Sequence, residues 1–166
     1  MFVFALALLA AGSGAVVPES MDAAAIPHYR VVRPGLATGG QPPVDTLRRL
    51  KDLGFQTVVN LRTESEPGVA DEKRLVEEAG LRYVHVPITA ASFSRADVDA
   101  VSRVLDDPAA GPVLLHCAAA VRVGAVWTVH QVGKGKTYEE AEAEGRTIGL
   151  KGGAMTDAVR RVLQAP

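Results

Sequence analysis

Apolar residues recur at every third or fourth position in six segments of the chain, the spacing that buries one face of an α-helix. The predicted helices cover residues 44–53, 69–79, 94–107, 122–132, 138–148 and 156–164. Two of them begin with a capping-box pattern, in which Ser94 precedes Asp97 and Thr137 precedes Glu140 by three positions. Gly54 ends the first predicted helix, as glycine often does at a helix C-terminus.

Short apolar segments alternate with these helices and predict β-strands. They cover residues 28–32, 36–38, 55–61, 81–88 and 112–116. The first two are separated by Pro34-Gly35 and read as a hairpin, whereas the continuous apolar run at 112–116 is typical of a strand buried on both faces of a parallel sheet. Strands joined through helices indicate βα units. The predicted fold class is therefore α/β, with a central, largely parallel sheet flanked by helices in a single domain over residues 28–166.

The N-terminal residues 1–15 are uncharged, rich in Phe, Leu and Ala, and end in Ser13-Gly14-Ala15. This pattern predicts a secretory signal peptide, followed by an N-terminal extension over residues 16–27. The apolar part is about half the ~20 residues that span a bilayer, so we expect no stable membrane insertion. The predicted location is therefore the periplasm or the extracellular space.

Composition narrows the possible functions. The 166 residues carry a net charge of −1, which creates no field that would collect nucleic acid, so no nucleic-acid partner is expected. One cysteine excludes an internal disulfide. The four histidines are widely spaced, so we expect no metal site, and nothing in the sequence calls for a cofactor.

Candidate chemistry lies at the end of the most buried strand, where His116 and Cys117 precede a short loop and a helix. Ligand sites of open α/β sheets lie at the carboxyl ends of the strands. Backbone N–H groups of residues Ala118, Ala119, Ala120 and Val121 could cradle an anion at the helix N-terminus. Arg122 could add a bidentate clamp, and the same positive field would stabilise a Cys117 thiolate.

Each of these residues also has a plainer interpretation. A lone Cys117 after a core strand can be a small buried hydrophobe, and Arg122 can be an exposed first-turn arginine. The helix dipole disfavours a cation at that position, so an anionic partner is the better interpretation of Arg122. Arg62 ends another strand at the same sheet edge and is either a second anion contact or a salt bridge to an adjacent glutamate.

Four separated motifs, in order, resemble one known family: residues 39–42 (GGQP), 54–62, 80–87, and His116-Cys117 with residues 122–125. The chain is similar, over about residues 28–135, to the phosphatase-like family of bacterial beta-lactamase-hydrolase-like proteins, a branch of the cysteine-dependent, dual-specificity-like phosphatases. The resemblance implies a cysteine-phosphatase fold, with Cys117 as the nucleophile that forms a phosphocysteine and Arg122 gripping the phosphoryl oxygens. It also implies that His116 orients the loop.

The loop departs from the pattern of typical tyrosine phosphatases in two ways. Four residues separate Cys117 from Arg122, where typical members have five, and this shorter form also resembles rhodanese-type sulfurtransferases, which would carry a persulfide on Cys117. Residues 119–121 are Ala-Ala-Val where the family usually has a Ser-Gly-Asn-like stretch. An alanine forced into the left-handed region costs about 1–2 kcal/mol, so the loop is either strained or free of unusual backbone angles.

A general acid is not evident, because the loop at residues 87–93 has no carboxylate. Asp97 is next along the chain, but its position fits helix capping better. His85 is interpreted as a core or interface histidine. For Glu64 and Glu66, surface solvation is the favoured role over facing the site.

These observations predict an exported, cysteine-dependent phosphatase of the tyrosine or dual-specificity type, acting on a phosphorylated small molecule or a phosphoprotein. The predicted catalytic residues are Cys117 and Arg122, with His116 and Arg62 in supporting roles. Two alternatives stay open: sulfur transfer through a Cys117 persulfide, and a catalytically impaired module that only binds anions.

Overall fold

A five-stranded sheet forms the centre of the computed structural model, which describes residues 17–22 and 25–165. The strands β1 (Arg30–Arg33), β2 (Leu36–Gly39), β3 (Thr57–Asn60), β4 (Arg82–His85) and β5 (Val113–His116) lie in the order β1-β2-β5-β3-β4. Only the β1–β2 pair is antiparallel; β2, β5, β3 and β4 run parallel to one another. This arrangement confirms the predicted α/β class with a largely parallel sheet.

The predicted signal peptide at residues 1–15 lies outside the described residues. Within the described part of the chain, no helix is long and apolar enough to cross a membrane.

Strand β5 is the central strand, and all four of its residues are buried. In the register of the sheet, His116 at its carboxyl end lies between Gly39 of β2 and Asn60 of β3. The carboxyl ends of three parallel strands therefore meet around His116, and the loops that follow these strands converge there.

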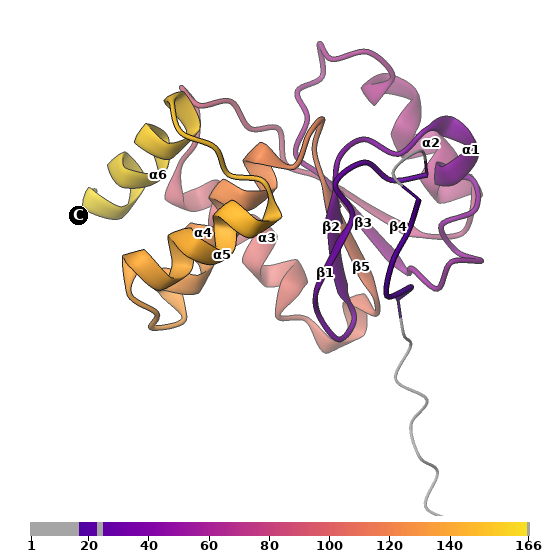
Figure 1. The fold of residues 1–166 in the computed structure, drawn as a ribbon. Helices are drawn as coiled ribbons and strands as arrows, with labels where there is room; N and C mark the ends of the chain where they lie inside the picture. The colour runs from indigo at the N-terminus through magenta and orange to yellow at the C-terminus, as the bar shows by residue number, and fades with distance from the viewer. Residues whose placement is uncertain (1–16, 23–24, 166) are drawn as a thin grey trace, which may run out of the picture.

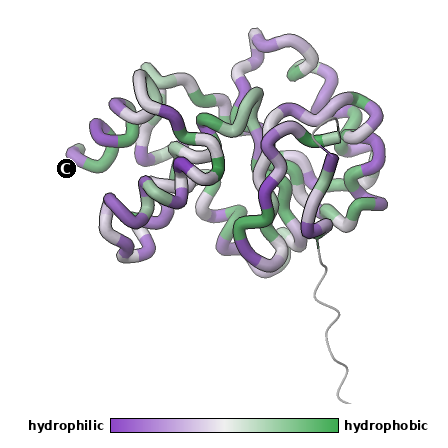
Figure 2. Tube along the Cα trace, in the orientation of Figure 1, coloured by the Kyte–Doolittle hydropathy of each residue, from purple (hydrophilic) through white to green (hydrophobic). Residues whose placement is uncertain are grey.

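Helices cover both faces of the sheet (Figure 1). One face carries α3 (Arg95–Leu105), α4 (Val121–Gly133), α5 (Tyr138–Ile148) and α6 (Ala154–Gln164), and the other carries α1 (Val44–Leu47) and α2 (Val69–Glu78). A short 3₁₀ turn, η1 (Pro108–Ala110), precedes β5. The apolar side chains form two clusters, one on each face of the sheet. Figure 2 shows the trace of α6 alternating between hydrophobic and hydrophilic residues, as expected of a helix with one buried face.

Local sequence signals set the starts of two helices, α3 and α5. Both capping boxes form, with Ser94 and Thr137 accepting hydrogen bonds from the backbone N–H groups of Asp97 and Glu140. Helix α4 packs closely on α5, because a Cβ on Gly124 would lie 2.5 Å from the carbonyl oxygen of Gly145. Glycine at this position therefore fixes how near α4, which carries Arg122, approaches α5.

The predicted helix over residues 44–53 is wrong in its length. Helix α1 ends at Leu47, and the chain continues to Gly54 in turns. Backbone hydrogen bonds such as Leu50 N–H to Leu47 O are of the tighter three-residue type. The apolar residues Leu47 and Leu50 are nonetheless fully buried, so the pattern identified the buried positions although the backbone is not a continuous α-helix.

Candidate active site

The residues 117–120 form a tight loop between β5 and α4. Cys117 follows the strand directly, is 1% exposed, and donates its backbone N–H to the carbonyl oxygen of Gly39 at 3.3 Å. The next residue, Ala118, accepts a hydrogen bond from the backbone N–H of Gln41 at 3.1 Å. The loop is thus fastened to the segment after β2, and Cys117 lies at the carboxyl edge of the sheet.

Ala120 adopts the left-handed conformation, with φ 60° and ψ 0°, at the N-cap of α4. Of the two alternatives left open by the sequence, the loop therefore has the strained backbone, and this conformation costs about 1–2 kcal/mol for an alanine. Close packing surrounds this residue, since a Cβ on Gly149 would lie 2.9 Å from the Cβ of Ala120. The residue that follows α5 therefore packs directly against the loop.

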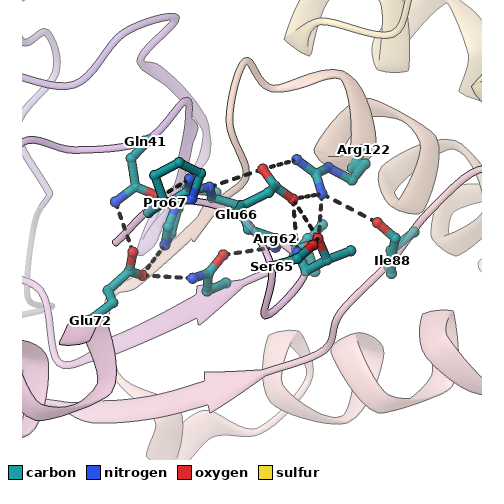
Figure 3. A network of polar contacts seen from close by, with 12 residues as sticks. Gln41, Arg62, Ser65, Glu66, Pro67, Glu72, Ile88 and Arg122 are labelled. Carbon is teal, nitrogen blue, oxygen red and sulfur yellow. Dashed lines mark hydrogen bonds and ion pairs between the residues drawn. The ribbon is translucent and has the colours of Figure 1, made fainter. Parts of the chain in front are cut away.

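Arg122, in the first turn of α4, is paired with Glu66. Its Nη1 and Nη2 groups donate to Glu66 Oε1 at 2.6 Å and Oε2 at 2.9 Å, so the pair is bidentate (Figure 3). Nη1 also donates to the carbonyl oxygens of Leu61 and Ile88, each at 3.3 Å. The predicted anionic partner of Arg122 is thus an internal carboxylate, and the prediction that Glu66 serves surface solvation is wrong because its carboxylate is turned inward onto a guanidinium.

Arg62 also binds Glu66. Its Nε donates to Glu66 Oε2 at 3.2 Å, its Nη1 to Gln41 Oε1 at 2.6 Å and its Nη2 to the carbonyl oxygen of Pro67 at 2.8 Å. The side chain is 7% exposed. Of the two interpretations left open by the sequence, the structure contains the salt bridge to a nearby glutamate.

The pairing of Glu66 with Arg122 stabilises the charged form of both side chains. The hydrogen bond from Arg122 lowers the pKa of Glu66 to about 2, against the effect of burial and with help from Thr63 and Arg62. The hydrogen bond to Glu66 likewise raises the pKa of Arg122, against the effect of burial. Glu66 and Arg122 therefore form a pair of oppositely charged groups beside the loop.

A fully buried hydrogen bond joins the residue before Cys117 to helix α2. His116 Nε2 donates to Glu72 Oε1 at 2.9 Å, and both side chains are 0% exposed. Glu72 also accepts hydrogen bonds from Asn60 Nδ2 at 3.0 Å and Gln41 Nε2 at 2.8 Å. Burial alone would raise the pKa of Glu72, but the donors, His116 foremost, lower it, so the group is a carboxylate. The predicted orienting role of His116 thus has a concrete partner.

The residues weighed as a general acid are either engaged in hydrogen bonds of their own or exposed. The carboxylate of Asp97 accepts hydrogen bonds from Ser94 N at 2.9 Å and Ser94 Oγ at 2.8 Å, as its predicted capping role requires. His85 is partly buried and donates from Nε2 to the carbonyl oxygen of Arg62 at 2.7 Å. Glu64 is exposed.

Two residues of this network were missed by the sequence analysis. Glu72 lies on the apolar stripe of α2, between Val69 and Leu75, and a charged residue on a buried stripe is the signal that identifies it. Gln41 belongs to the motif at residues 39–42, but nothing in the sequence pairs it with Arg62 or Glu72.

Among the described residues, no group of three or more His, Cys, Asp or Glu side chains could hold a metal ion.

Comparison with known proteins identifies relatives of this chain. Residues 28–134 match the family described as beta-lactamase hydrolase-like protein, phosphatase-like domain. The beta-lactamase hydrolase-like protein of Xylella fastidiosa (strain Temecula1 / ATCC 700964) is 32% identical over 137 residues, which are 79% of this chain and 32% of the relative. The protein of the same name from Agrobacterium fabrum is 28% identical over 120 residues, 69% of this chain and 28% of the relative. The chain therefore spans about a third of the length of these curated relatives.

Several solved structures share the fold of this chain. TpbA of P. aeruginosa superposes with a TM-score of 0.66 at 23% identity, covering 90% of this chain and 91% of TpbA. The core catalytic domain of the PP-IP phosphatase SIW14 from S. cerevisiae gives a TM-score of 0.66 at 14% identity, covering 81% of this chain and 85% of that domain. At these identities the likeness is one of fold.

Proposed function

The chain belongs to the family of phosphatase-like domains of beta-lactamase hydrolase-like proteins, and on this premise we propose that it is a cysteine-dependent phosphatase. Its substrates are phosphomonoesters of the tyrosine or dual-specificity type, on a small molecule or a protein. The domain comprises residues 28–166, and the signal peptide at residues 1–15 directs it out of the cytoplasm.

The observation that carries this proposal is the relation between Cys117 and Arg122 across the tight loop. Cys117 precedes the loop and Arg122 lies in the first turn of α4, so the helix N-terminus and the guanidinium can act together on one bound anion. A thiolate is the form of cysteine that attacks phosphorus. Glu66 holds the outer end of the guanidinium, which leaves the edge with Nε available for a phosphoryl oxygen beside Cys117.

The reaction proceeds in two displacements. The Cys117 sulfur forms a bond to phosphorus while the bond to the leaving oxygen breaks, and that oxygen departs with the electron pair. Water then attacks the phosphocysteine, its proton passes to solvent, and the sulfur–phosphorus bond breaks to return the thiolate. Arg122 and the backbone N–H groups of residues 118–121 stabilise the charge on the equatorial oxygens in both transition states.

The test is hydrolysis of p-nitrophenyl phosphate by the reduced protein, with Cys117→Ser and Arg122→Lys assayed beside it. We expect turnover that is abolished in Cys117→Ser, and that falls steeply in Arg122→Lys because a lysine cannot form the bidentate clamp. Gln164→Ala, at an exposed position of α6, is the control that should retain full activity. Turnover that survives in Cys117→Ser would refute the proposal.

Sulfur transfer, one alternative left open by the sequence, rests on the loop of four residues between Cys117 and Arg122, and the family match does not favour it. In that reaction the Cys117 thiolate attacks the outer sulfur of thiosulfate, a sulfur–sulfur bond forms, and sulfite leaves with the electron pair without needing a proton. The persulfide would add the mass of one sulfur atom to the protein. A mass increase that is absent in Cys117→Ser, together with no hydrolysis of p-nitrophenyl phosphate, would favour sulfur transfer over phosphatase activity.

A further inference from the structure

Two side chains, Gln41 and Asn60, contact both Glu72 and Arg62, which belong to the two halves of the polar network around the loop. Asn60 donates from Nδ2 to Glu72 Oε1 at 3.0 Å, and its Oδ1 accepts from the backbone N–H of Arg62 at 2.8 Å. Of the two, Gln41 is the one that binds the Arg62 guanidinium. Its Nε2 group donates to Glu72 Oε2 at 2.8 Å, and its Oε1 accepts from Arg62 Nη1 at 2.6 Å (Figure 3). Its backbone N–H donates to Ala118 O at 3.1 Å, so the same residue also contacts the loop directly.

The two halves lead to opposite ends of the loop. On one side, Glu72 holds His116, the residue before Cys117. On the other side, Arg62 shares the Glu66 carboxylate with Arg122, the residue that closes the loop. An unbroken series of hydrogen bonds and ion pairs therefore runs from the residue before the nucleophile to the arginine after it, and it passes through the amide of Gln41.

The position calls for a neutral side chain with both a donor and an acceptor, as an amide has. The group facing Glu72 must donate, because the carboxylate only accepts, and the group facing Arg62 must accept, because a guanidinium only donates. A glutamate at position 41 would set two carboxylates against each other, and a methionine of similar length would serve neither partner. These requirements fix the orientation of the Gln41 amide, with its nitrogen toward Glu72 and its oxygen toward Arg62.

We propose that Gln41 is a positioning residue that couples the Cys117 side of the loop to the Arg122 side. It keeps the Cys117 sulfur and the Arg122 guanidinium in a fixed position relative to each other. This inference rests on the proposed roles of Cys117 and Arg122. Gln41 acts through Arg62 and Glu72 and does not itself take part in the chemistry. Without the Gln41 amide, Arg62 loses one hydrogen-bond partner, and its contact with Glu66 becomes less rigid. Glu72 also loses one of the donors that hold its carboxylate next to His116.

The test measures the alkylation rate of Cys117 by iodoacetamide at neutral pH, with and without inorganic phosphate, in the full chain. The rate reports the thiolate, and protection by phosphate reports the anion site, so neither readout needs turnover. We expect Gln41→Met to slow alkylation and to raise the phosphate concentration for half-protection, each by about ten-fold, the effect of losing one hydrogen bond to a charged group. Gln164→Met, exposed on α6, should change neither.

A double-mutant cycle separates coupling from a general loss of stability. If Gln41 acts through Glu66, Gln41→Met should change the phosphate concentration for half-protection by less than about two-fold when Glu66→Gln is already present, because mutations that share partners are not additive. Full additivity, or no effect of Gln41→Met on either readout, would overturn the proposal. If Gln41→Met unfolds at the assay temperature, Gln41→Asn, too short to reach both partners, is judged by the same criteria.

The outcome also distinguishes this inference from the proposed function. If phosphate gives no protection in the unmodified protein, the phosphatase proposal fails, and the coupling is judged from the alkylation rates alone. Additive effects of Gln41→Met and Glu66→Gln on those rates would then refute the role of Gln41.

Discussion

Glu66 accepts hydrogen bonds from both terminal nitrogens of Arg122, Nη1 to Oε1 at 2.6 Å and Nη2 to Oε2 at 2.9 Å, although the two residues are 56 positions apart in the chain. The arginine of the loop is therefore oriented before any substrate arrives. A bidentate pair fixes the plane of the guanidinium as well as its position, and a preoriented cation loses less entropy when it binds a transition state. The following predictions test this arrangement and the surroundings of the loop.

Glu66→Gln should alter the acid stability of the protein. The pKa of Glu66 is lowered from 4.5 to about 2, so its ion pair stabilises the folded state fully above about pH 4.5 and is lost as the pH falls toward 2. In thermal unfolding between pH 2 and pH 6, the unmodified protein should lose more stability than Glu66→Gln as the pH is lowered. Glu64→Gln, an exposed change in the same loop, is the control and should follow the unmodified protein. Parallel curves for Glu66→Gln and the unmodified protein would contradict the prediction.

Asp97→Ala separates helix capping from acid catalysis. The Asp97 carboxylate accepts hydrogen bonds from both Ser94 N and Ser94 Oγ, so its loss should destabilise the protein by about 1 kcal/mol, as loss of a cap does. Ser94→Ala should have a similar effect. Hydrolysis of p-nitrophenyl phosphate and its pH profile should remain unchanged in both variants. A fall in turnover confined to Asp97→Ala, with the basic limb of the profile lost, would assign this residue the acid role instead.

Elements whose boundaries depend on neighbouring residues could be predicted from the sequence. The capping boxes at Ser94 and Thr137 place two helix starts, and the continuous apolar run before Cys117 identifies the central strand. The failure at residues 44–53 has a physical cause, because buried leucines at three-residue intervals fit successive tight turns as well as an α-helix. The spacing of apolar residues reports which side is buried more reliably than it reports the hydrogen-bond pattern.

The candidate site could be predicted only in part. The sequence places Cys117 and Arg122 near each other because only four residues lie between them in the chain. It does not reveal that Glu66 meets Arg122, or that Gln41 joins Arg62 to Glu72, because these contacts depend on how the loops after β2 and β3 and the helix α2 converge at one sheet edge. From the sequence alone, a glutamate among polar residues is expected to be solvated. Only the folded structure shows that the carboxylate of Glu66 is paired with a guanidinium.

Gly149→Ala should disturb the loop from outside the polar network. An added Cβ would lie 2.9 Å from the Cβ of Ala120 and 3.0 Å from its backbone, so either the loop or the end of α5 must move. Displacement of a catalytic group by about 1 Å can lower a rate by about 10²-fold, and we expect kcat/KM for p-nitrophenyl phosphate to fall by at least ten-fold. Gly153→Ala is the matched control, because Gly153 also has a positive φ, +100° against +154° at Gly149, while a Cβ there meets nothing within 4 Å. Equal activities of the two variants would show that the packing of Gly149 on Ala120 does not position the loop.

The hydrolysis rate should depend strongly on the leaving group. Asp97 is engaged in its helix cap, and Glu66, whose pKa is about 2, is ionised at neutral pH and has no proton to donate. A leaving oxygen that departs as an anion is favoured when its conjugate acid is strong, whereas general-acid catalysis is worth about 10²–10⁴-fold and flattens this dependence. For a series of substituted phenyl phosphates, log kcat/KM should therefore decline steeply as the pKa of the phenol rises, and serine phosphate should react slowest. The slope should be the same in Asp97→Ala, and a shallow slope in the unmodified protein would mean that a group other than Asp97 or Glu66 protonates the leaving oxygen.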